Sequence, residues 1–181
     1  MQNQSSKTEP QIYVACLAAY NNGKLHGRWI SATQDAESIQ SEISEILKAS
    51  PEPFAEEWAV HDYDGFGQIE LGEWPDMARV SKIAELIEEH GDGFELWYTN
   101  QDGQHSDVDE LEEKFLEQWQ GAHDSREAFA DYLLESTGQL AEVPEWARNY
   151  FDYEGYARDL ELNGDYSFIY NHGQIYVYSN H

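Results

Sequence analysis

The residues of this 181-residue chain that stand out for possible chemistry are Asp and Glu, because they are numerous and closely spaced. Residues 107–161 hold 16 Asp and Glu against four Lys and Arg, a local net charge of −12. A folded surface with so many carboxylates repels itself, because like charges within a Debye length of about 10 Å destabilise the compact state. The acids therefore need a use that outweighs this repulsion. They are Asp107, Asp109, Glu110, Glu112, Glu113, Glu117, Asp124, Glu127, Asp131, Glu135, Glu142, Glu145, Asp152, Glu154, Asp159 and Glu161.

Two kinds of catalytic site are built from carboxylates. Glycosidases need one pair of acids at a fixed separation, but any two of the 36 acids satisfy that count, so the sequence singles out no pair. His61, Asp62 and Asp64 cluster in one segment, yet DYDGFGQIELGE lacks the acid that an EF-hand calcium loop places fifth. No nucleophile or phosphate-binding loop has recognisable spacing. We therefore expect no catalytic residue, no metal and no cofactor.

The composition favours a folded cytoplasmic protein. Aromatic residues make up 14% of the chain, far more than a disordered acidic segment carries. The single cysteine, Cys16, excludes an intrachain disulfide and a cysteine-based metal site. The net charge of −26 disfavours binding to nucleic acid or to an anionic membrane surface. The longest apolar run, residues 12–20, is less than half of the roughly 20 residues of a membrane span, and residues 1–10 show no cleavable signal pattern.

Helices must position the acids of the 107–161 stretch. Leu111, Phe115 and Trp119 recur at helical spacing between the carboxylates, and Phe129 with Leu133 repeats the pattern further on. We therefore expect packed helices with carboxylates on their outer faces. The residues Asp124 to Glu127 have the logic of a capping box, with the Glu127 carboxylate reaching back to the helix start.

The remaining pattern predicts small sheets and further helices. Thr33 or Asp35 is available as N-cap of the first long helix, and the segment 94–98 suits a strand or a helix equally. The predicted elements are a hairpin of strands 11–19 and 25–30, a helix at 35–49, a strand at 57–63, a helix opened by Pro75 and closed by residues 91–93, helices ending at Gly138 and beginning at Pro144, and a closing hairpin of strands 166–170 and 174–178.

A solvated, halophile-like surface would explain the charge without any partner. Alternatively, the carboxylates imitate the phosphates of DNA. Since duplex DNA carries one charge per about 1.7 Å of axis, the 26 net charges match about 44 Å, or about 13 base pairs. A compact chain of this length has a radius of gyration of about 16 Å. Mimicry therefore predicts an elongated molecule.

Three segments resemble the ArdA family of antirestriction proteins: IYVACLAAYNNGKLHGRWI, EWAVHDYDGF and, most specifically, VPEWARNYFDYEGYARDLELNGDYSFI. The resemblance implies a protein of conjugative plasmids and transposons that inhibits type I restriction-modification enzymes. It implies a homodimer whose surface imitates bent B-form DNA, without a catalytic set. It also implies an elongated α+β chain of three small domains: an N-terminal α/β domain with antiparallel strands (11–70), a helical middle (71–104) and an acidic C-terminal α+β domain with helices and a short sheet (105–181).

A dimer of such acidic chains needs an apolar contact surface. The segment Trp119, Gln120, Gly121, Ala122 and His123 is our candidate, because it interrupts the acidic run with a large aromatic residue and no carboxylate. The alternative is that Trp119 belongs to the core of its helix. Two other functions stay open beside mimicry of DNA: an acidic adaptor for another basic protein, and an enzyme that uses a carboxylate pair or a metal.

Overall fold

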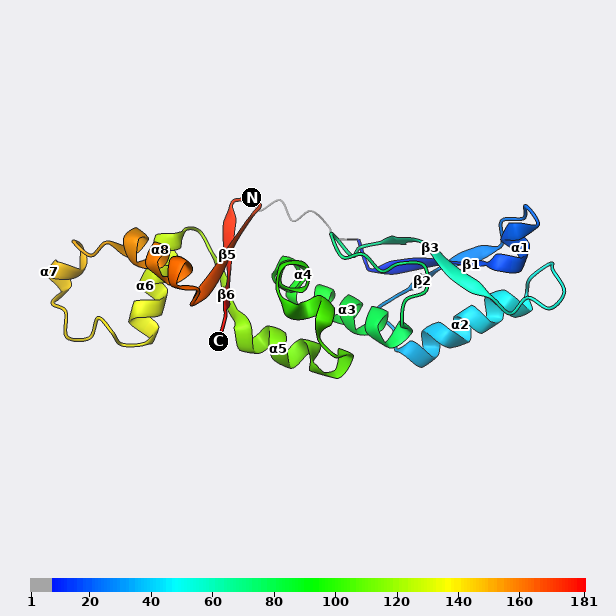
Figure 1. Ribbon diagram of the computed structural model, residues 1–181, viewed down its shortest axis with the longest axis horizontal. Coiled ribbons are helices and arrows are strands. Elements are labelled where there is room, and N and C mark those ends of the chain that lie inside the picture. The colour runs from blue at the N-terminus through cyan, green and yellow to red at the C-terminus, as the bar shows by residue number, and fades with distance from the viewer. Residues whose placement is uncertain (1–7) are drawn as a thin grey trace. The chain divides into compact units, whose positions relative to one another are not determined.

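The computed structural model describes residues 8–181 and combines helices with two small antiparallel sheets (Figure 1). The chain divides into two compact units between Glu110 and Leu111, and each unit is described by itself. The mixed helix-and-sheet composition expected from the sequence is confirmed. The division into three domains stays a prediction.

The first unit is built on a three-stranded sheet with the order β2-β1-β3. Its strands are β1 (Gln11–Cys16), β2 (Gly27–Ser31) and β3 (Trp58–Asp64), and both pairings are antiparallel. The predicted hairpin and third strand are thus confirmed. The first strand is shorter than predicted, because pairing with β2 ends at Ala15 and residues Leu17–Asn21 turn into a short helix, α1.

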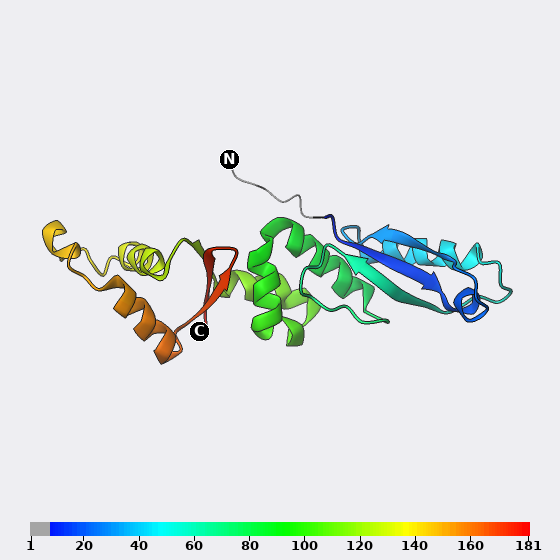
Figure 2. The same ribbon diagram turned by 90° about the horizontal axis from the view of Figure 1, so that it is seen from above.

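Helix α2 (Ala36–Lys48) packs against β1 and β2 and covers one face of this sheet (Figures 1 and 2). Ile39, Ile43 and Ile46 form its buried stripe, as the spacing predicts. Of the two candidate N-caps, Asp35 is the one used, and its carboxylate accepts the Ser38 N–H at 2.8 Å.

Helix α3 (Met77–His90) comes after β3 in the chain and ends at the C-cap residue Gly91, as predicted. The ambiguous segment 94–98 is helical, because Phe94, Trp97 and Tyr98 share the buried face of α4 (Asp92–Asn100). Two short 3-10 helices complete the unit, η1 (Asp102–His105) and η2 (Val108–Glu110).

The second unit places a three-stranded sheet, ordered β4-β6-β5, against helices. Its elements are α5 (Leu111–Gln118), β4 (Trp119–His123), α6 (Arg126–Ser136), α7 (Glu145–Arg148), α8 (Tyr153–Asn163), β5 (Tyr166–Asn171) and β6 (Gln174–Ser179). The closing hairpin of β5 and β6 is confirmed. Helices α6 and α8 contact each other.

The expectation that helical structure continues through Trp119 is wrong. Helix α5 ends at Gln118, and Trp119 begins strand β4, which pairs with β6. The Trp119 ring lies 5.3 Å from the Tyr178 ring and stacks on Phe115 at 5.7 Å. The contact with Tyr178, its partner on the neighbouring strand β6, outweighs the local helical spacing.

Phe129 is the centre of the core of the second unit. Its side chain is fully buried and packs with Leu133, Ile175 and Val177. The rings of Tyr166 and Phe168 lie edge-on to it at 5.2 and 5.4 Å. The helix α6 is thereby joined to strands β5 and β6 across a long stretch of sequence.

We expect Phe129→Ala to lower the free energy of unfolding by about 3–5 kcal/mol, because it removes buried apolar surface and leaves a cavity. Urea denaturation followed by circular dichroism measures this change. The matched control is Tyr170→Ala on β5, whose side chain is 72% exposed and whose loss should cost less than about 1 kcal/mol. Equal effects of the two substitutions would show that Phe129 does not centre a core.

Candidate partner-binding surface

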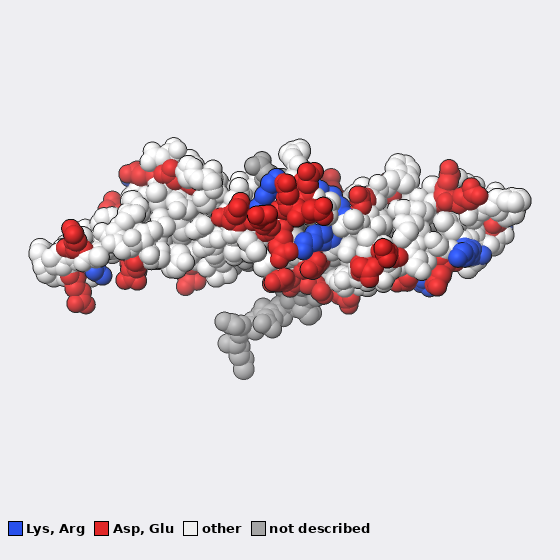
Figure 3. All heavy atoms as spheres, turned by 90° about the horizontal axis from the view of Figure 1, so that it is seen from below, with Lys and Arg blue, Asp and Glu red and all other residues white. Residues whose placement is uncertain are grey.

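The predicted acids lie on the surface. Of the 16 carboxylates singled out in residues 107–161, 14 are exposed, and the other two, Glu112 and Glu161, are half-buried. Figure 3 shows Asp and Glu side chains spread over the face in view, with few Lys and Arg between them. The carboxylates are therefore accessible to a partner, but the structure does not test which of them bind one.

Helix α5 shows how the sequence directs carboxylates outward. Leu111 and Phe115 are fully buried one turn apart, whereas Glu113 and Glu117 are exposed on the opposite side of the same two turns. Because side chains four residues apart share a helix face, burial of the apolar pair fixes the direction of the acidic pair.

Several of the predicted acids also stabilise the local fold. Ser125 caps α6, and its hydroxyl accepts the Ala128 N–H at 3.2 Å. The backbone N–H of Glu127 and then the Ser125 hydroxyl hold the pKa of the Glu127 carboxyl below its usual value. Asp152 caps α8 by accepting the Gly155 N–H at 2.9 Å. The capping box predicted over residues 124–127 is thus only partly confirmed: the Glu127 carboxylate reaches back to Ser125, but Ser125 rather than Asp124 is the N-cap, and its hydroxyl caps the N–H of Ala128.

Two further acids of the stretch have partners inside the second unit. Glu161 forms an ion pair with Arg126 at 2.7 Å, and the same guanidinium lies over the Phe168 ring at 5.3 Å. Burial, followed by the charge and hydrogen bond of Asp131, raises the pKa of the Tyr153 hydroxyl. The ion pair of Glu161 with Arg126 reduces the repulsion among neighbouring carboxylates.

The first unit is as acidic as the second, which the emphasis on residues 107–161 missed. Residues 1–110 hold 22 acids and 6 bases, a net charge of −16, whereas residues 111–181 hold 14 acids and 4 bases, a net charge of −10. Glu85, Glu88 and Glu89 are exposed along one side of α3. Their i, i+3, i+4 spacing was the signal that could have identified this second acidic face.

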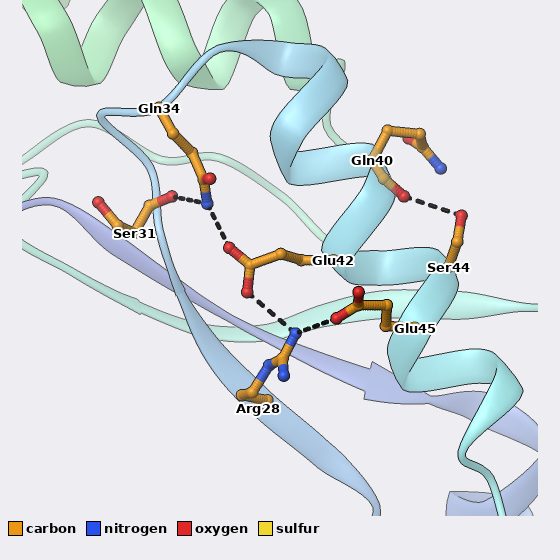
Figure 4. A network of polar contacts seen from close by, with 7 residues as sticks. All are labelled: Arg28, Ser31, Gln34, Gln40, Glu42, Ser44 and Glu45. Carbon is orange, nitrogen blue, oxygen red and sulfur yellow. Dashed lines mark hydrogen bonds and ion pairs between the residues drawn. The ribbon is translucent and has the colours of Figure 1, made fainter.

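Some carboxylates of the first unit are instead neutralised within it. Arg28 on β2 contacts two carboxylates of α2, Glu42 at 2.9 Å and Glu45 at 3.5 Å (Figure 4). The Gln34 amide donates to the other oxygen of Glu42 at 2.7 Å and to the Ser31 carbonyl at 3.0 Å. This network ties α2 to the edge of the sheet and lowers the negative charge of that face.

The candidate dimer segment forms β4, an edge strand of its sheet. Ala122 is exposed, while Trp119, Gln120, Gly121 and His123 are half-buried. The Trp119 ring packs on Phe115 and Tyr178 of its own unit, so this side chain contributes to the core. Other apolar side chains of the second unit are more exposed, among them Trp146 at 72% and Tyr150 at 85%.

His61, Asp62 and Asp64, the candidates for a metal site, each interact with a different neighbour. The His61 ring meets the Tyr20 ring edge-on at 4.7 Å. Asp62 and Asp64 each accept the backbone N–H of the following residue at 2.9 Å. Within residues 8–181, no group of three His, Cys, Asp or Glu side chains is placed to hold a metal ion.

Comparison with known proteins gives one result for most of the chain. Residues 12–175 match the family described as antirestriction protein (ArdA). No curated protein matches the sequence. In the part of the chain that the structure describes, no helix has the length and apolar character needed to cross a membrane.

Proposed function

The chain belongs to the ArdA family of antirestriction proteins, and we propose that it inhibits type I restriction-modification enzymes by occupying their DNA-binding groove as a mimic of B-form DNA. The observation that carries this proposal is the exposure of 14 of the 16 carboxylates in residues 107–161. They face solvent on folded helices and loops, where a basic protein can reach them. The protein would act in the cytoplasm, together with its target.

Charge density supports DNA as the imitated molecule. A groove that binds DNA is lined by Lys and Arg, and binding there depends on the number of phosphates that these cations neutralise. The net charge of −26 matches about 44 Å of duplex at about 1.7 Å per charge. We propose that an elongated row of three small domains lays this charge out along the groove.

Collective action of the carboxylates follows from this mechanism. Each acid replaces one of many phosphate contacts, so the single change Glu113→Gln should leave inhibition within about twofold of wild type. Neutralising Asp107, Asp109, Glu110, Glu112, Glu113 and Glu117 together should weaken inhibition at least about a hundredfold at low salt, and the difference from wild type should shrink at high salt, where the charges are screened. Competition with labelled DNA for a purified type I methyltransferase core measures both effects, with circular dichroism as the control for folding.

A localised site would give a different result. If one single neutralisation abolished inhibition while the fold was retained, collective mimicry would be wrong. If the sixfold variant competed as well as wild type, the acids of this segment would have no part in binding.

Inhibition by mimicry requires neither turnover nor a metal. We expect the inhibitory activity to be unchanged after treatment with a chelator, and to depend on the molar ratio of protein to enzyme rather than on time. Titration of the methyltransferase core with untreated protein and with chelator-treated protein tests this directly. Loss of inhibition in chelator, followed by recovery on addition of a divalent cation, would indicate a metal-dependent activity instead.

We further propose that the protein acts as a homodimer. Two copies carry twice the charge of one and match about 88 Å of duplex. Two negative bodies associate only where apolar or backbone contact outweighs repulsion. Strand β4 offers such a contact, because an edge strand can pair with its copy through backbone hydrogen bonds, and Ala122 on this strand is exposed.

Ala122→Asp should convert the dimer into a monomer, since it adds a charge at the centre of the proposed interface. Analytical ultracentrifugation at micromolar concentration compares it with wild type and with Tyr150→Asp, a change at an exposed aromatic residue outside β4. The proposed interface predicts that only Ala122→Asp dissociates. A monomeric wild type refutes the dimer, and dissociation by Tyr150→Asp alone moves the interface to the region of α7.

A further inference from the structure

Arg79 directs its guanidinium into the first unit. From α3, its Nε donates to the Tyr98 hydroxyl at 2.9 Å, and its Nη1 donates to the Ser106 carbonyl at 2.8 Å. Its Nη2 donates to the carbonyls of Gly103 at 2.8 Å and Gln104 at 3.1 Å. One side chain thereby joins α3, α4 and the segment that follows α4.

The segment bound by Arg79 is packed closely on α4. A Cβ atom added to Gly103 would lie only 2.6 Å from the Cα of Tyr98, so the backbone approaches the helix as closely as a glycine permits. Ser106 is 4% exposed. Carbonyl groups removed from water need donors, and the guanidinium supplies them to the buried residues Gly103 and Ser106 and also bonds the carbonyl of the exposed Gln104.

A group of three exposed acidic residues follows directly after Ser106, the last residue whose carbonyl Arg79 binds. Asp107 follows Ser106 in the chain, and the Glu110 N–H donates to the Asp107 carbonyl at 3.1 Å, which closes the turn of η2. Asp107, Asp109 and Glu110 are all exposed, and η2 contacts α3. The bonds of Arg79 thus fix the point from which these three carboxylates extend.

We propose that Arg79 is a positioning residue for partner binding: it holds residues 103–106 against α3 and α4, so that Asp107, Asp109 and Glu110 are presented in one arrangement. The inference rests on the proposed function, because it assigns these carboxylates to the contact with the enzyme. Three acids within four residues repel one another, and a loosely held segment would spread them apart. A fixed segment avoids the entropic loss of ordering them on binding.

The fork of the guanidinium is the feature that this role requires. Lysine retains the positive charge but has no planar set of donors, so Arg79→Lys cannot reach the three carbonyls and the Tyr98 hydroxyl together. Arg28→Lys is the matched control, since it changes another arginine of the same unit that contacts Glu42 and Glu45 on a different element.

A double-mutant cycle tests the proposal. The variant Asp107→Asn/Asp109→Asn/Glu110→Gln and the variant Arg79→Lys should each weaken competition with DNA by about tenfold, in the middle of the range for coupled groups. In the Arg79→Lys background, the three neutralisations should add less than about twofold. Effects that multiply independently, as expected in the Arg28→Lys background, would overturn the proposal.

Amide hydrogen exchange supplies a measurement that does not depend on inhibition. Arg79→Lys should accelerate exchange in residues 103–110 and leave strand β1 unchanged, whereas Arg28→Lys should leave residues 103–110 as in wild type. If Arg79→Lys fails to fold, Tyr98→Phe removes one of the four bonds and should give a smaller change in the same residues. Unchanged exchange at 103–110 in a folded Arg79 variant overturns the proposal.

The two measurements separate this inference from the proposed function. A wild-type protein that does not compete with DNA refutes mimicry, while the exchange experiment still decides whether Arg79 holds the segment. Faster exchange at 103–110 combined with undiminished competition would show that the segment is held but that its carboxylates are not contacts, which also overturns the proposal.

Discussion

Repulsion among carboxylates is the constraint to which the rest of this structure responds. A net charge of −26 on 181 residues opposes folding, and the opposing contribution comes from aromatic-rich cores such as that around Phe129. Four arginines among the ten Lys and Arg side chains contact groups of their own unit. Arg79 and Arg148 donate to backbone carbonyls, and Arg28 and Arg126 pair with carboxylates of their own unit. Arginine thus stabilises the fold: Arg79 and Arg148 do so through backbone carbonyls, whereas Arg28 and Arg126 offset the charge of a few carboxylates.

The sequence predicts those elements whose signal is local. Apolar spacing identifies α2 and α3, turn residues identify the closing hairpin, and the N-cap of α2 is narrowed to Thr33 or Asp35, between which the structure selects Asp35. The sequence does not predict β4, because the strand pairing of Trp119 is with Tyr178 at the end of the chain. The strand propensity of a short segment contains no information about a pairing partner more than fifty residues away in the sequence.

The candidate surface is predictable in kind but not in detail. Exposure of the carboxylates follows from helix amphipathicity, as Leu111 and Phe115 illustrate. The acids of α3 carry the same signal outside the 107–161 stretch. The contacts of Arg79 with residues 103–106 depend on tertiary packing of three segments, so no spacing in the sequence indicates them. Family membership adds the partner class, which neither charge nor fold identifies.

We propose that this protein occupies the DNA-binding groove of its target enzyme through its charge. The most direct test is the affinity of the protein for a purified type I methyltransferase core over a series of sodium chloride concentrations, measured beside the affinity of DNA for the same enzyme. Mimicry predicts that both affinities fall linearly on a log–log plot with steep slopes, and that each ligand excludes the other. An affinity that is independent of salt, or simultaneous binding of protein and DNA, would show that the protein does not occupy the DNA-binding groove as a mimic of DNA.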